Sequence, residues 1–350
     1  MAKAKKKLLP KDFEDLLKKG DLAELKAVFD TCDINARGGY AKQSALAFDD
    51  CPDTLARWLI AQGADLTATD TWGNTPLHAR SRSRQGRIEA LLQLGADVDS
   101  KDSSSDTPLH AAASSHNTRN SRLLIEHGAQ VDSVNGRGQT PLELALQSCN
   151  NIDLEQMVPL AEDFFAAGAK KTPRMRDSVG EIGKRFEFHR NGFNPDSVDA
   201  VSNALDQLYA LFDVPPVPRR RDHDGNMPIV VKATEWHKQH EELWDLLVPS
   251  KGYAATVQGE VIRISGRIAH ELDDNEGINW DADFNTMADA LLKHVHEGNP
   301  LSSSDLSEVA KLVAGVKRKS GDMGRLGKLA VTWVLSNPQP FKLAPPTYTR

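Results

Sequence analysis

The tetrapeptide Thr-Pro-Leu-His occurs twice in this chain, at residues 75–78 and again 32 residues later at 107–110. Related segments flank the pair, Ser44-Ala45-Leu46-Ala47 before it and Thr140-Pro141-Leu142-Glu143 after it. A period this regular indicates stacked copies of one supersecondary unit, each of which buries its apolar face against the next. Each copy closes with a glycine: Gly63, Gly95 and Gly128 keep the period, and Gly168 is delayed by an insertion near residues 150–157.

The residue types of the repeat have definite physical tasks. Threonine can cap a helix N-terminus, and the proline that follows occupies the first helical position, where its missing N–H costs little. The leucine faces the next copy, and the histidine can bond to the backbone of a neighbouring turn. The closing glycines suit the left-handed residue that follows a second helix.

Thr-Pro-Leu-His combined with Gly95-Ala96-Asp97, at a period of about 33 residues, resembles the ankyrin repeat. The resemblance covers roughly residues 8–173 and implies an all-α ankyrin-repeat solenoid of about five repeats. The first unit, residues 10–30, lacks the tetrapeptide, as a capping repeat would. Two departures stand out. Arg80, Ser81, Arg82 and Arg84 replace small apolar residues, which predicts a short helix or an exposed basic face, and Ser105 replaces a preferred glycine, which predicts a distorted turn.

The period is not visible beyond Pro173, so the sequence predicts four segments. These are a basic flexible tail over residues 1–9, the ankyrin repeat domain over 10–173, a helical C-terminal domain over 174–337 and an extended tail over 338–350. Amphipathic stripes predict helices over residues 196–212, 234–247, 257–272, 284–295, 304–316 and 323–334. This half loosely resembles the helical region of bacterial ankyrin-repeat proteins. The resemblance implies no particular activity for it. Residues 229–231 fit either a short strand or buried coil.

Composition excludes several classes of function. The net charge of −6 and pI near 6.0 argue against a nucleic-acid binder, and the arginine clusters at residues 80–87 and 219–221 lack interleaved aromatic residues. No apolar run reaches the length of a membrane span. Cys32, Cys51 and Cys149 have no metal-site spacing and fit reduced thiols in a cytoplasmic protein.

Catalytic motifs are absent from the sequence, so we predict a protein that is not an enzyme and uses no metal or cofactor. His237, His240 and Glu241 are the nearest approach to a metal site, but His240 falls on the apolar stripe between Trp236 and Leu243, where a structural histidine is expected. The acidic loop over residues 273–283 misses the calcium-loop pattern. The alternative to a non-catalytic protein is an enzyme, either metal-dependent or metal-independent, with its active site in the helical C-terminal domain.

The ankyrin resemblance implies binding of a protein partner on the concave side, formed by finger tips and first helices. Trp72 lies at a predicted finger tip with no obvious core to enter, and tryptophan, tyrosine and arginine dominate interface energetics. Partners of this kind include toxins and effectors. An immunity protein that neutralises a toxin, an adaptor or a regulatory subunit would each agree with this resemblance. The predicted partner-binding residues are Tyr40, Thr71, Trp72, Asn74, Arg82, Arg84, Asp106 and Arg137.

Overall fold

The computed structural model describes residues 4–220 and 223–350, apart from the side chain of Pro195. The chain forms two compact units. One comprises Met1–Phe186 and Asn194–Val217, and the other comprises Glu187–Phe193 and Pro218–Arg350. None of the helices in the described ranges is long and apolar enough to cross a membrane.

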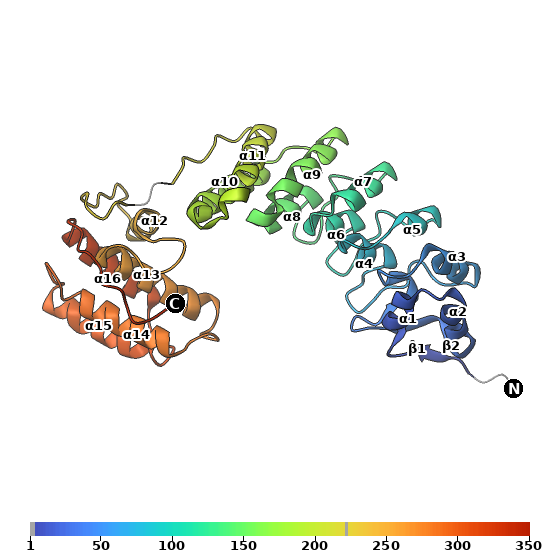
Figure 1. Cartoon of the computed structure of the whole chain (residues 1–350), viewed down its shortest axis with the longest axis horizontal. Coiled ribbons are helices and arrows are strands. Elements are labelled where there is room, and N and C mark those ends of the chain that lie inside the picture. Colours follow the sequence, from blue (N-terminus) through green and yellow to red (C-terminus); the bar gives the residue numbers. More distant parts are fainter. Residues whose placement is uncertain (1–3, 221–222) are drawn as a thin grey trace. The chain divides into compact units, whose positions relative to one another are not determined.

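The first unit is a stack of helical hairpins, which confirms the predicted all-α solenoid with about five repeats. The first helices of successive repeats, α4, α6 and α8, lie side by side, and the second helices pack behind them (Figure 1). The paired elements are α1 (Phe13–Lys19) and α2 (Leu22–Thr31), η1 (Ala45–Ala47) and α3 (Asp53–Ala61), α4 (Pro76–Arg82) and α5 (Glu89–Gln93), α6 (Pro108–Ser114) and α7 (Thr118–Glu126), and α8 (Pro141–Ser148) and α9 (Leu154–Ala166).

The tetrapeptide residues perform the tasks predicted for them. The hydroxyl of Thr75 accepts a hydrogen bond from the main-chain N–H of His78, the imidazole of His78 accepts one from the N–H of Thr75, and Pro76 is the first helical residue. Thr107 and His110 repeat this capping box. Leu77 and Leu109 are completely buried between neighbouring repeats.

A small sheet, which the sequence did not reveal, lies in the N-terminal part of the first unit. Strand β2 (Cys32–Gly38) pairs in parallel with β1 (Lys6–Leu8) and antiparallel with β3 (Gln43–Ser44). Part of the predicted flexible tail over residues 1–9 is therefore ordered. The reason is that Leu9 is buried and its N–H donates to Arg37 O, while Cys32 Sγ donates to Leu8 O. Residues 1–3 lie outside the described part.

The stack extends one hairpin beyond the predicted boundary at residue 173, with α10 (Pro173–His189) as far as Phe186 and α11 (Pro195–Phe212). The turn η3 (Arg190–Gly192) between these helices belongs to the second unit. Thr172 follows Thr140 by 32 residues, and its hydroxyl accepts from the N–H of Met175 at 3.2 Å, as the other threonines do. The ring of Phe212 meets Phe165 of α9 edge-on at 5.1 Å. Arg174 and Met175 replace the leucine and histidine of the tetrapeptide, which hid this copy from the sequence analysis.

The second unit is helical, as predicted, and its core surrounds α13. Val261, Ile264 and Ile268 of α13 are completely buried, and so is Trp333. Ile229 is buried coil that donates its N–H to Pro338 O at 2.8 Å, not a strand. The elements are α12 (Trp236–Leu247), α13 (Val257–Ala269), a π-helical turn η4 (His270–Asp274), α14 (Ala282–His294), α15 (Ser303–Val316) and α16 (Met323–Ser336).

The C-terminal segment is extended and docks on α13 through a buried charged cluster. Arg263 donates to both carboxylate oxygens of Glu260, at 2.6 and 2.9 Å, and the hydroxyl of Tyr348 donates to Glu260 at 2.7 Å. Burial acts to raise the pKa of Glu260, but these hydrogen bonds outweigh it and lower the pKa below its ordinary value. The segment thus completes the hydrogen bonding of a carboxylate inside the core.

Candidate protein-binding surface

Finger tips of neighbouring repeats are joined by a series of main-chain hydrogen bonds. The N–H of Thr71 donates to Ala41 O at 3.0 Å, that of Ser103 to Trp72 O at 3.2 Å, and that of Gly136 to Ser104 O at 2.8 Å. The fingers are therefore held in a fixed register before any partner arrives. A preorganised surface of this kind loses little conformational entropy when it binds.

The fingers of repeats three to five are each shaped by an Asx turn with a left-handed residue at the same place. In the third repeat, Asp70 Oδ1 accepts from the N–H groups of Trp72 and Asn74 at 2.8 and 2.9 Å, and Gly73 has a φ of +82°. In the fourth repeat, Ser105 adopts a φ of +61° and Asp102 makes the equivalent two bonds. The distortion predicted at Ser105 does not occur, because the serine accepts the conformation that glycine has in the neighbouring fingers.

Tyr40 and Trp72, which we call the aromatic pair, lie on adjacent fingers. Their ring centroids are 5.9 Å apart with an interplanar angle of 39°. Tyr40 is 94% exposed and Trp72 is 50% exposed. Trp72 thus packs sideways on the neighbouring finger and still presents half of its surface to solvent.

The other predicted partner-binding residues divide into two groups. Asn74 is buried and bonds through its amide to Asp70, while Asp106 accepts from Asn135 Nδ2 at 2.8 Å, so both hold finger turns in place. The second group consists of side chains that face solvent: Thr71, Arg82, Arg84 and Arg137. Of these, Arg84 pairs with Asp153 at 3.2 Å.

The arginine-rich helix α4 excludes one of the two alternatives drawn from its sequence, a shortened helix, and meets the other, an exposed basic face, only in part. It has the same length as α6, so it is not shortened. Arg82 is exposed, but Arg80 is completely buried and has no hydrogen-bond partner for Nε or Nη1 in the described residues. Burial lowers the pKa of Arg80, opposed by the nearby Cys51 and Asp53. The same burial raises the pKa of the Cys51 thiol to about 12, so this cysteine is an inert thiol.

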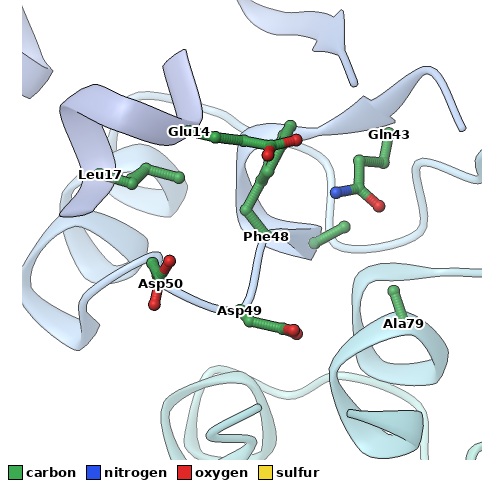
Figure 2. Close-up of a pocket in the computed structure, with 8 residues that line it drawn as sticks. Glu14, Leu17, Gln43, Phe48, Asp49, Asp50 and Ala79 are labelled. Carbon is green, nitrogen blue, oxygen red and sulfur yellow. The ribbon is translucent and has the colours of Figure 1, made fainter. Parts of the chain in front are cut away.

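A pocket opens where the first helix of the second repeat is reduced to the single turn η1 (Figure 2). Its volume is about 270 Å³. Glu14 reaches into it from α1, while Asp49 and Asp50 follow η1 on the opposite side (Figure 2). Leu17 and Phe48 form a buried apolar wall. We call this the acidic pocket. Sequence analysis missed it, although two aspartates where a helix would have continued were a usable signal.

Desolvation distinguishes Asp49 from an ordinary surface carboxylate. The side chain is exposed overall, but neighbouring groups shield part of the carboxyl and raise its pKa above the ordinary value. A hydrogen bond with Ser83 and the charge of Arg80 oppose this shift, and Asp50 adds to it. A cation placed in the pocket would relieve the repulsion between the two aspartates.

The histidines of α12 have separate structural surroundings. His240 is half-buried, with Nε2 at 3.0 Å from Ser265 Oγ and its ring stacked on Trp244. His237 is exposed and lies 3.0 Å from Glu235. Burial lowers the pKa of His240, opposed by Glu241. Across residues 4–220 and 223–350, no three His, Cys, Asp or Glu side chains are grouped to hold a metal ion.

Comparison with known families identifies the repeats. The family described as ankyrin repeats (3 copies) matches residues 43–117 and 82–158, and this repeat region belongs to the ankyrin repeat family. Among solved structures, an ankyrin repeat domain from Acinetobacter baumannii AYE aligns at 20% identity and a TM-score of 0.41, over 57% of this chain and 96% of that one. No curated protein sequence matches the chain. Ankyrin repeats are modules of protein–protein interaction.

Proposed function

We propose that this protein is a non-catalytic binding protein that holds a protein partner on the concave face of its ankyrin repeats. The observation that carries the proposal is the aromatic pair, which is exposed on fingers already fixed by main-chain hydrogen bonds. Large exposed aromatic side chains on a rigid support are typical of interface hot spots. Arg82, Arg84 and Arg137 are further exposed guanidinium groups of the repeats, of which Arg84 already pairs with Asp153.

Within this class, we propose a cytoplasmic protein that acts as an immunity protein against a toxin or as an adaptor. Both roles require a preformed surface that binds one polypeptide, and the ordered fingers supply it. The net charge of −6 complements a basic partner. The three cysteines are free and buried, which agrees with a reducing compartment.

The test begins with a pull-down of the tagged protein from its native host and identification of the captured partner by mass spectrometry. The affinity of that partner is then measured for a Trp72→Ala, Arg82→Ala double variant. Loss of an aromatic anchor and an arginine at an interface should weaken binding by about tenfold or more. Unchanged affinity in a folded double variant would remove the concave face from the proposal.

Glu126→Ala supplies a matched control. Glu126 is an exposed residue that ends α7, a second helix behind the finger face. Its substitution should leave both the fold and the affinity unchanged. Equal losses in the control and in the double variant would indicate a general effect on charge or stability and would count against the proposal.

A further inference from the structure

We propose that the acidic pocket receives a cationic side chain, arginine or lysine, of the bound partner. This inference deepens the proposed function and rests on it, since it names the chemistry that the concave face recognises. The pocket is built by a departure from the regular repeat, because the first helix of the second repeat ends after Ala47, whereas α4 and α6 each run for seven residues. The missing turns leave the cavity of about 270 Å³.

The carboxylates of the pocket are not neutralised by ion pairs. Throughout the described ranges, no Lys, Arg or His nitrogen is recorded within 4.0 Å of a carboxylate oxygen of Glu14, Asp49 or Asp50. The buried Arg80 acts on Asp49 through its charge but forms no hydrogen bond with it among the described residues. Three carboxylates therefore line one small volume, and an incoming cation gains attraction from all three.

The walls of the pocket suit a basic side chain rather than a free ion. Phe48 and Leu17 are 4% and 3% exposed, and they form an apolar surface beside the carboxylates. Arginine and lysine have the matching construction, an apolar stem that packs on hydrocarbon and a charged head that stays polar. Gln43 adds an amide at the rim, on the side opposite the aspartates (Figure 2).

The aromatic pair gives an independent reason to expect a basic partner segment. Tyr40 lies three residues before Gln43, so the aromatic pair and the pocket belong to one stretch of the concave face. The exposed faces of Tyr40 and Trp72 attract cations through the negative charge density of their rings. A segment with two spaced basic residues would place one on the aromatic pair and the other in the pocket.

The test uses two synthetic peptides, acetyl-Ala-Arg-Ala-amide and the same peptide with neutral citrulline in place of arginine, titrated into the full chain and followed by NMR. The arginine peptide should shift the side-chain amide of Gln43 and the methyl groups of Ala47 and Ala79 in a saturable way. The citrulline peptide should bind at least about fivefold more weakly, since it keeps the shape and loses the charge. A lysine peptide shows which of the two cations is preferred.

Matched variants locate the effect. The double variant Asp49→Asn, Asp50→Asn should abolish the saturable shifts. The control double variant Asp15→Asn, Asp30→Asn makes the same change in net charge at exposed positions of α1 and α2, and it should preserve the shifts. Equal binding of arginine and citrulline peptides, or shifts confined to other residues, would overturn the inference. If Trp72→Ala weakens partner binding but the arginine peptide shifts no signal of the pocket residues, the pocket inference alone is rejected. The proposed function then stands.

Discussion

The imidazole Nε2–H of His78 donates a hydrogen bond of 2.9 Å to the main-chain carbonyl of Asp106, which lies in the next repeat. His110 makes the equivalent bond, 3.0 Å long, to Gln139 O. In both cases Nδ1 accepts from the threonine that caps the same helix, so one buried ring satisfies a helix start and a finger of the following repeat. These histidines join each hairpin to the next through bonds that are shielded from water.

Replacement of His78 by alanine should therefore destabilise the repeat stack. The change removes the hydrogen bonds of a buried ring and leaves Asp106 O without that partner, at an expected cost of about 2–3 kcal/mol. Urea denaturation followed by circular dichroism measures the loss. His127→Ala, in which a largely exposed histidine is removed, is the control and should change stability by less than about 0.5 kcal/mol.

Stability of the first unit should fall when the solution is acidified. Burial lowers the pKa of His78 and His110 below the ordinary value of 6.5, so the unfolded chain binds protons that the folded chain does not. The free energy of unfolding therefore decreases as the pH falls from about 7.5 to about 5.5, and this part of the loss ends below the folded pKa values.

A series of urea denaturations across that pH range measures the effect, and the His78→Ala variant should show a shallower slope. A slope as steep as that of the unmodified protein would mean that other groups are responsible.

Ser105→Gly should stabilise the protein. Ser105 has a φ of +61° at a turn position where the adjacent fingers have Gly73 and Gly138, at +82° and +67°. A side chain in this left-handed region costs about 1 kcal/mol, part of which is offset by the larger entropy of glycine in the unfolded chain. Thermal unfolding should show a higher Tm for Ser105→Gly, while Gly138→Ser should lower it. A lower Tm for Ser105→Gly would contradict this account of the turn.

Thr172→Ala should loosen the hairpin of α10 and α11. The hydroxyl of Thr172 caps α10 through Met175 and also donates to the buried Glu143 at 2.7 Å. Loss of such a cap costs about 1–2 kcal/mol. Hydrogen exchange should speed up in α10 and α11 and stay unchanged in α4. Exchange that is unaffected in α10 would show that this hairpin is held by its apolar contacts alone.

The sequence predicts the repeats well because the residues that cap each helix bond to one another within a short motif. Thr75 and His78 bond to each other within four residues and so reveal their helix, whereas the capping role of Thr172 is visible only once its bonds to Met175 and Glu143 are known. Strand β2 depends on pairing with residues far away in the chain. Arg80 looked exposed because arginine usually is, and only the tertiary packing buries it.

The candidate site shows the same division. The sequence placed Tyr40 and Trp72 on neighbouring fingers through the repeat period alone. Asn74 and Asp106 occupy the predicted positions, but their side chains are engaged in turn hydrogen bonds that no period reveals. The acidic pocket combines Glu14 with Asp49 from another repeat, at a place where the helix is shorter than its neighbours. A short helix is the least predictable element of a repeat, because its end depends on packing.

Site-specific photocrosslinking tests most directly whether the concave face holds a polypeptide. A photoreactive phenylalanine analogue replaces Tyr40, which is 94% exposed, or Glu126 behind the fingers, and the protein is irradiated in its native host. The account predicts a covalent adduct with one defined protein from position 40 and none from position 126. Adducts from position 126 alone, or equal yields of the same adduct from both positions, would contradict it.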